Sequence, residues 1–159
     1  MIESKDNVII NEDTVGEKAK NKIDVLLVEP GKYPRMVSMD SGLESLQKAV
    51  DGDIQAVYYW DDPVALICNE EGKINGLRAN RAVYDEDGEM VDIICGIFLI
   101  TGLGEEDFTS LPKDMQEKYE KMFHDPEVFL KLNGRILALP TKPDRPPKSV
   151  EKTSRGAEL

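Results

Sequence analysis

The chain has 159 residues, and its 20 basic and 31 acidic side chains give a net charge of −11. That length fits one compact domain with terminal extensions, and a hydrophobic fraction of 40% is enough for a core but low for a chain folded throughout. Because so acidic a chain repels phosphate, we expect no direct binding to nucleic acid.

A polar arm precedes the first predicted strand. Residues 1–22 are mostly polar, with one apolar run at Val8–Ile10, and they show neither the basic start nor the apolar segment of a secretory signal. The longest near-apolar stretch, Ile93–Leu103, is far shorter than the roughly 20 residues of a membrane-spanning helix. We therefore expect a flexible arm followed by a soluble, cytoplasmic domain with no membrane contact.

The first half of the chain combines strands with one helix. β-branched and alternating apolar residues predict strands over 23–28, 34–39, 54–60 and 64–69. The last two are separated by a short turn, which favours antiparallel pairing between them. Apolar residues at helical spacing predict a helix over 43–50, capped by Asp40 or Ser41 and ended by Gly52.

The next segment leaves one element undecided. Residues 77–84 fit either a short helix or an extended segment, and the acidic turn Asp85–Gly88 indicates a hairpin. Residues 90–94 and 97–100 predict one long strand, with Gly96 as a bulge or bend.

A second, amphipathic helix is predicted from Leu111. Apolar residues recur every three or four positions up to Phe123, Pro112 fits the first turn, and Thr109 or Ser110 can cap it. Residues 128–132 are expected to add a last turn or two. Four prolines between Pro140 and Pro147 then indicate a disordered tail.

These elements predict an α+β fold, with a mostly antiparallel sheet of four to six strands and two main helices. We expect a single domain over residues 23–133, between a flexible arm over 1–22 and a Pro-rich disordered tail over 134–159.

Few side chains are available for catalysis or metal binding. His124 lies where the second helix should end, and a histidine there usually serves the helix carbonyls and dipole. Cys68 and Cys95 resemble small buried hydrophobes on strands, with a disulfide between them as the open alternative. One histidine and two cysteines cannot complete a four-ligand zinc site, so we expect no metal and no cofactor.

Acidic residues concentrate in the turns. Residues 40–107 contain sixteen acidic and four basic side chains, whereas the chain from Lys131 onward is basic. Carboxylates that rim one end of a sheet would imitate a row of phosphates and occupy the basic groove of a nucleic-acid-binding enzyme. The alternative is that they serve only solubility. The residues predicted to contact such a partner are Asp61, Asp62, Glu70, Glu71, Asp85, Glu86 and Asp87.

The polar segment 69–81 gives a second hypothesis. Its amide and basic side chains are the types that hold a carboxylate, phosphate or base edge, and a nearby aromatic ring can stack on a flat ligand. For the arginines of this segment, structural ion pairing is the alternative. The residues predicted to hold a small ligand such as a nucleotide are Asn69, Lys73, Asn80, Arg81 and Trp60.

Several sequence blocks occur in an order that resembles one family. They are Val25–Pro34, Leu43–Val50, Asn69–Lys73, Gly76–Leu77, Asn80–Ala82 and Gly96–Ile100 with Gly102. Together, over about residues 23–125, they resemble domain-of-unknown-function family 3846, although Asp51-Gly52 stands where that family tends to show Gly-Gly. The resemblance implies the company of phages, plasmids and conjugative elements. It implies no established activity and no catalytic residues.

The acidity and the resemblance together predict a binding protein. We expect a non-enzymatic acidic protein of a phage or mobile element that inhibits a host defence protein, namely a nucleic-acid-binding enzyme in the bacterial cytoplasm. The alternative is a domain that binds or sequesters a nucleotide. A metal-dependent enzyme with paired carboxylates is a third class, but nothing in the sequence fixes two acids at a suitable separation.

Overall fold

An antiparallel sheet forms the centre of the molecule. The structure, a computed structural model, describes residues 22–145. Within them six strands pair in the order β3-β2-β8-β5-β4, with the short β9 added to β8. All of these pairs are antiparallel, including β4 with β5 as the sequence predicted. The strands are β2 (Lys22–Val28), β3 (Arg35–Asp40), β4 (Ile54–Val57), β5 (Val64–Asn69), β8 (Phe98–Leu103) and β9 (Phe108–Thr109).

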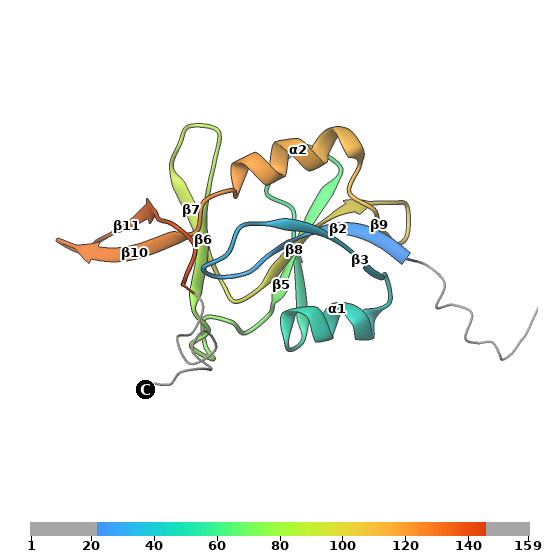
Figure 1. The fold of residues 1–159 in the computed structure, drawn as a ribbon, viewed down its shortest axis with the longest axis horizontal. Coiled ribbons are helices and arrows are strands. Elements are labelled where there is room, and N and C mark those ends of the chain that lie inside the picture. Colours follow the sequence, from blue (N-terminus) through green and yellow to red (C-terminus); the bar gives the residue numbers. More distant parts are fainter. Residues whose placement is uncertain (1–21, 146–159) are drawn as a thin grey trace, which may run out of the picture.

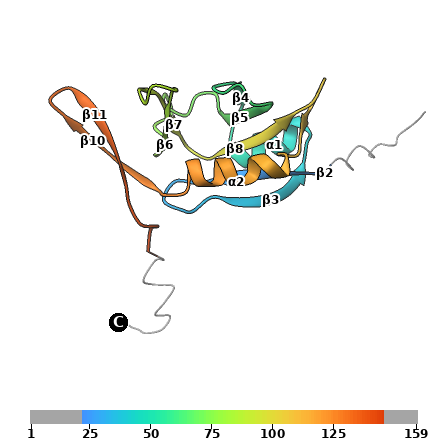
Figure 2. The ribbon, with the colours of Figure 1, turned by 90° about the horizontal axis from the view of Figure 1, so that it is seen from above.

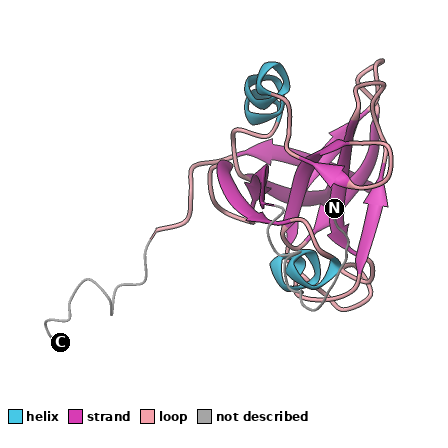
Figure 3. Ribbon diagram, turned by 90° about the vertical axis from the view of Figure 1, so that its right-hand side faces the viewer, coloured by secondary structure: helices cyan, strands magenta, loops and turns pink. Residues whose placement is uncertain are grey.

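Both faces of the central sheet are covered. Alternate residues of β2, β5 and β8 belong to two separate hydrophobic clusters, one on each face. One cluster includes Leu46 of α1 (Leu43–Val50), and the other includes Tyr119 of α2 (Lys113–Met122). The two helices of the described residues therefore lie on opposite sides of the strands (Figure 3). This is the α+β fold with mostly antiparallel strands that the sequence predicted.

A separate hairpin packs on the same face of the central sheet as α2. It consists of β6 (Ala79–Tyr84) and β7 (Met90–Cys95), so the undecided segment 77–84 is largely a strand. The prediction of one long strand over 90–100 is wrong, because β7 and β8 belong to different sheets. Gly96 forms the corner between them with φ +88°, and a Cβ there would meet Leu77 Cδ1 at 2.7 Å. Only glycine fits this corner without strain.

A second hairpin extends away from the body of the molecule (Figures 1 and 2). It is formed by β10 (Glu127–Leu132) and β11 (Arg135–Pro140), which pair only with each other among the described residues. The predicted helical turns over 128–132 are therefore wrong, and residues 135–140 form a strand although we expected tail from residue 134. The cause is the Asn133-Gly134 turn, where φ values of 53° and 77° match the type I′ turn typical of hairpins.

The helix starts differ from the predicted caps. α1 follows Gly42 and has no side-chain cap, so neither Asp40 nor Ser41 serves it. The Ser110 hydroxyl does not cap α2 either, because it accepts the backbone N–H of Asp24 at 2.8 Å and ties the helix entry to β2. None of the helices in the described residues has the length and hydrophobicity to cross a bilayer.

Candidate functional site: an acidic groove and a neighbouring cavity

Acidic residues from two distant turns meet in one groove beside α2. The β4–β5 connection brings Asp61 and Asp62, and the tip of the β6–β7 hairpin brings Asp85–Asp87, to a hollow of about 670 Å³. Five carboxylates there face a single ammonium, that of Lys118, so the groove attracts cations. We call it the acidic groove, and it is lined by Tyr59, Trp60, Asp61, Asp62, Tyr84, Asp85, Glu86, Asp87, Lys118 and Met122.

One rim of the acidic groove is the β6–β7 turn, which is stabilised by the side chain of its first residue, Asp85. The Asp85 carboxylate accepts the backbone N–H groups of Asp87 and Glu89, both at 2.9 Å. Gly88, with φ +82°, supplies the left-handed conformation that closes this turn. Asp85 is thus engaged internally, and a fixed backbone presents the exposed carboxylates of Glu86 and Asp87 to solvent.

On the opposite rim the carboxylate of Asp62 is fixed by hydrogen bonds and partly neutralised by Lys118. Asp62 accepts hydrogen bonds from the Lys118 ammonium at 2.5 Å and from the Tyr119 hydroxyl at 2.7 Å. These two bonds lower the pKa of Asp62. Burial and the neighbouring carboxylate raise the pKa of Tyr119, which keeps its hydroxyl a donor. Free negative charge on the groove therefore comes chiefly from Asp61, Glu86 and Asp87.

Apolar surface lies beside these carboxylates. The Trp60 ring packs against Tyr119 and Phe123, with ring centroids 4.9 Å and 6.1 Å apart, which fixes its orientation at the groove. Tyr84 and Met122 add side chains that are 43% and 44% exposed. Aromatic and thioether surface next to carboxylates suits the aliphatic stem and charged head of an arginine or lysine.

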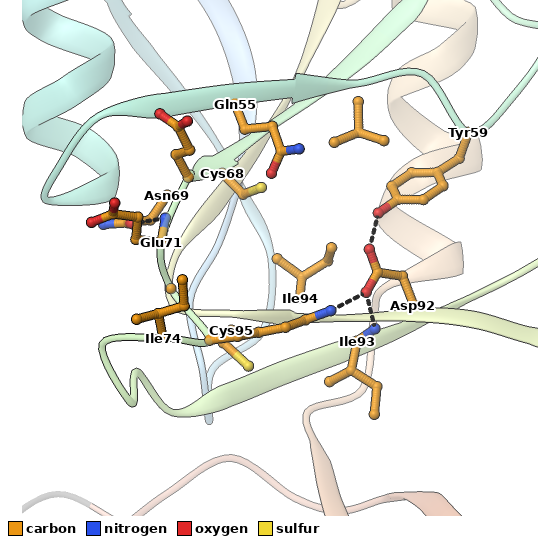
Figure 4. A pocket seen from close by; sticks show the side chains of 14 residues that line it. Gln55, Tyr59, Cys68, Asn69, Glu71, Ile74, Asp92, Ile93, Ile94 and Cys95 are labelled. Carbon is orange, nitrogen blue, oxygen red and sulfur yellow. Dashed lines mark hydrogen bonds and ion pairs between the residues drawn. The ribbon is translucent and has the colours of Figure 1, made fainter.

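A second cavity shares Tyr59 with the acidic groove and lies between the central sheet and the β6–β7 hairpin (Figure 4). Its volume is about 340 Å³. Asp92 accepts hydrogen bonds there from the Tyr59 hydroxyl and the Lys73 ammonium, both at 2.5 Å, and from the Ile93 N–H at 2.8 Å. Burial raises the pKa of Asp92, but the bonds from Lys73 and Tyr59 outweigh burial and lower it overall. Asp92 thus fastens the hairpin to the β4–β5 edge of the sheet.

Both cysteines line this second cavity as free thiols. Burial raises the pKa of Cys68 to about 11 and also raises that of Cys95. Since the thiolate is the reactive form, these thiols are poor nucleophiles at neutral pH. Among residues 22–145, no group of three or more His, Cys, Asp or Glu side chains is placed to hold a metal ion.

The predicted ligand residues are not brought together. Asn69 and Lys73 line the second cavity, whereas Trp60 lines the acidic groove. Asn69 is also engaged, because its amide donates to two carbonyls at the end of α1, each at 3.1 Å. Asn80 and Arg81 are 1% and 0% exposed and line neither hollow, so we remove them from the candidate site.

A β-bulge explains why these two adjacent polar residues are both buried. Ala79 pairs with Cys95 and Arg81 pairs with Ile94, which leaves Asn80 as the extra residue of β6. The Asn80 amide then donates to the backbone carbonyls of Val28 and Gly96, at 3.0 Å and 2.8 Å. Asn80 therefore joins the central sheet to the corner that follows β7.

Arg81 has a structural role as well. Its guanidinium donates to the carbonyls of Phe123 at 2.9 Å and Lys32 at 2.7 Å, and to Asn80 Oδ1 at 2.8 Å. Burial lowers the pKa of Arg81, and the Glu127 carboxylate opposes that effect. Arg81 connects β6 to the end of α2 and to the β2–β3 turn, and it is not available to an external anion.

The predicted acidic surface is divided among several hollows. Glu70 and Glu71 line the second cavity instead of the acidic groove. With Asp92 they place three carboxylates against the ammonium of Lys73, which does not favour a phosphate ligand. The acidic turn Glu105–Asp107 lines a further hollow beside α1.

Several residues of the two hollows were not predicted from the sequence, among them Lys118, Tyr84, Met122 and Asp92. Asp92 carries a usable signal, because it is the one charged residue between Met90 and Ile100. An isolated acid in an apolar strand needs a specific partner. Met122 belongs to the predicted apolar face of the second helix, so no local pattern marks it as groove surface.

The fold and the site together define an acidic α+β domain in which five carboxylates from two turns meet at one groove. The chain matches the family described as Domain of unknown function (DUF3846) over residues 23–124, and it belongs to that family. The matched residues include α1, α2 and the β6–β7 hairpin and end before β10. No curated protein and no solved structure matches the chain.

Proposed function

We propose that this chain is a non-enzymatic binding protein of a phage or mobile element that inhibits a host defence protein in the bacterial cytoplasm. The observation that supports this is the acidic groove, where carboxylates from two turns are fixed beside exposed aromatic surface. An enzyme that handles nucleic acid offers a basic surface to phosphate, and fixed carboxylates compete for that surface. Inhibition then results from exclusion of the nucleic acid.

The chemistry of the acidic groove favours an arginine- or lysine-bearing segment of such a partner. Asp61, Glu86 and Asp87 supply charge that Lys118 does not neutralise. Trp60 and Tyr84 supply ring surface on which a guanidinium can stack. The turn that carries Glu86 and Asp87 is already fixed by internal hydrogen bonds, so little ordering is needed on binding.

Trp60 gives a direct assay, because it is the only tryptophan of the chain and it lines the acidic groove. An arginine-rich peptide serves as the probe, and its titration should change the tryptophan fluorescence. We expect the affinity to fall as salt rises, since the contact is largely electrostatic. An affinity that does not depend on salt would contradict a charge-driven groove.

A matched pair of variants tests the location. The double variant Asp61→Asn/Asp87→Asn removes two charges from the acidic groove, and Glu105→Gln/Glu106→Gln removes two from the turn beside α1. We expect the first pair to weaken peptide binding by about tenfold or more and the second pair to leave it nearly unchanged. Equal losses would mean that only net charge matters. Competition between the protein and DNA for candidate host nucleases then tests inhibition itself.

The second cavity gives weaker support to the alternative, a nucleotide-binding domain. Its volume lies at the lower end of small-molecule sites. Its excess of carboxylates over the single Lys73 ammonium disfavours a phosphate group. A thermal shift with a panel of nucleotides separates the two proposals, because a tight ligand in large excess should raise stability by about 2–4 kcal/mol. A clear shift lost in Lys73→Ala would favour the alternative.

A further inference from the structure

The β10–β11 hairpin carries an exposed aliphatic face. In the hairpin register Val128 lies opposite Leu139, and Leu130 lies opposite Leu137, so these four side chains and Leu132 share one face. All five are between 39% and 57% exposed. We call this set the arm face, and it consists of Val128, Leu130, Leu132, Leu137 and Leu139. Arg135, which pairs with Leu132, lies on the same side at the tip of the hairpin.

The opposite face of the hairpin contacts the body at its base, whereas Ile136 on that face, nearer the tip, is 48% exposed. Glu127 lies on that side and its carboxylate accepts the backbone N–H of Ala82 in β6 at 2.9 Å. The arm face therefore points away from β6, and none of the other described residues buries it. A lone two-stranded hairpin is at best marginally stable in water, so an extended arm with an aliphatic face favours a partner.

The charge of the arm favours a second copy of this chain as that partner. Lys131 and Arg135 stand near the tip of the hairpin, and the body carries the acidic turns described above. A basic enzyme of the kind that suits the acidic groove would be repelled by these two cations. A second copy offers the opposite charge on its body and the same aliphatic row on its arm, with Arg135 at the tip end of that row.

The geometry also suits self-association. A two-fold interface joins the same patch on both copies, and a flat row of aliphatic side chains is complementary to itself. If the two arms run in opposite directions, each basic tip points toward the acidic body of the other copy. Leu130, near the middle of β10, then lies close to the two-fold axis.

We propose that the chain forms a homodimer in which the arm faces of two copies pack against each other about a two-fold axis. The hairpin follows the region shared with the family, so the dimer is an addition to the family domain. The dimer holds two acidic grooves, which would raise the apparent affinity for a partner with two basic sites. Five half-exposed side chains from each copy form a small contact, so we expect a weak association.

Sedimentation velocity of the full chain tests the proposal. Across about 1 µM to 1 mM we expect the mass to rise from the 17.8 kDa of one chain toward twice that value. Leu130→Lys should hold the protein in the monomeric form at every concentration. Leu43→Lys is the matched control, because Leu43 is a 59% exposed leucine on α1 far from the arm, and it should dimerise as the wild type does. Thermal unfolding of each variant checks that the body stays folded.

Cysteine cross-linking tests which face is used. Leu130→Cys lies on the arm face, and Lys131→Cys lies on the opposite face one residue away. Under mild oxidation we expect an intermolecular disulfide for Leu130→Cys and little for Lys131→Cys. A full chain that is monomeric throughout the concentration range overturns the proposal, as does equal cross-linking of the two variants. The acidic-groove variants Asp61→Asn/Asp87→Asn should still dimerise, which separates this inference from the proposed function.

Discussion

Replacement of Arg81 by methionine tests whether this residue stabilises the fold. The side chain is fully buried, and its guanidinium donates three hydrogen bonds of 2.7–2.9 Å, two of them to backbone carbonyls. Methionine fills a similar volume but leaves those acceptors without a donor. A buried hydrogen bond from a charged group contributes about 1.5–3 kcal/mol, and relief of the desolvation of the cation offsets part of the loss.

The net effect expected for Arg81→Met is a loss of about 3–5 kcal/mol in the free energy of unfolding. With a urea dependence of about 2 kcal/mol per molar, the unfolding midpoint should fall by roughly 2 M. The unfolding midpoint of Arg81→Lys should lie between those of Arg81→Met and the wild type, because one ammonium cannot reach three separated acceptors. Urea titrations followed by Trp60 fluorescence and by circular dichroism measure both variants.

Arg78→Met is the control for this comparison. Arg78 is half-exposed, and its guanidinium pairs with the carboxylate of Asp144 at 2.7 Å on the surface. An exposed pair of this kind contributes less than about 1 kcal/mol, so the control should unfold near the wild-type midpoint. If Arg81→Met unfolded at as high a urea concentration as Arg78→Met, the buried network would not stabilise the fold, and a structural role would no longer explain the burial of Arg81.

Three further variants or conditions test other parts of the structure. Tyr119→Phe removes one of the hydrogen bonds that lower the pKa of Asp62, so an NMR titration should show that pKa moving up toward its usual value. The pKa of Asp92 is lowered in the folded state, so its contribution to stability is present above the usual value of 3.8 and is lost as the pH falls through the folded pKa. Asp92→Asn should therefore lose less stability than the wild type between pH 5 and pH 2 in urea titrations, and an equal loss would contradict the Tyr59–Asp92–Lys73 network. Alkylation of Cys68 and Cys95 near pH 8 should be much slower in the folded chain than in urea, because burial raises the pKa of both thiols.

The sequence predicted the central sheet because its signals are local. Val64–Cys68 is an uninterrupted apolar run, and the structure buries all six residues of β5 between two layers. Asn133-Gly134 is a strong hairpin signal, but the arm was missed because the residues before this pair were assigned to helical turns and those after it to a proline-rich tail. The role of Arg81 was beyond any local pattern, since its acceptors on Lys32 and Phe123 lie more than 40 residues away in the chain.

The candidate site, like the fold, was predicted only where the signal is local in the sequence. The acids at turns were recognised as partner-binding candidates, but the meeting of Asp61 and Asp62 with Asp85–Asp87 in one groove depends on how the β6–β7 hairpin sits against the sheet. That placement is set by Asp92 at one strand, which binds Tyr59 and Lys73, and by the bulge at Asn80 on the other. Neither contact is visible in the spacing of the sequence.

The β6–β7 hairpin therefore links the stability of this domain to its proposed activity. Asn80 and Arg81 fix its base through the central sheet and α2, and Asp92 fixes its side through Tyr59. With base and side fixed, the acidic turn at its tip is held opposite Asp61 before any partner arrives, and a preformed groove has a lower ordering cost on binding. It follows that Asp92→Asn, although it removes no charge from the acidic groove, should weaken binding of a basic peptide by loosening one rim.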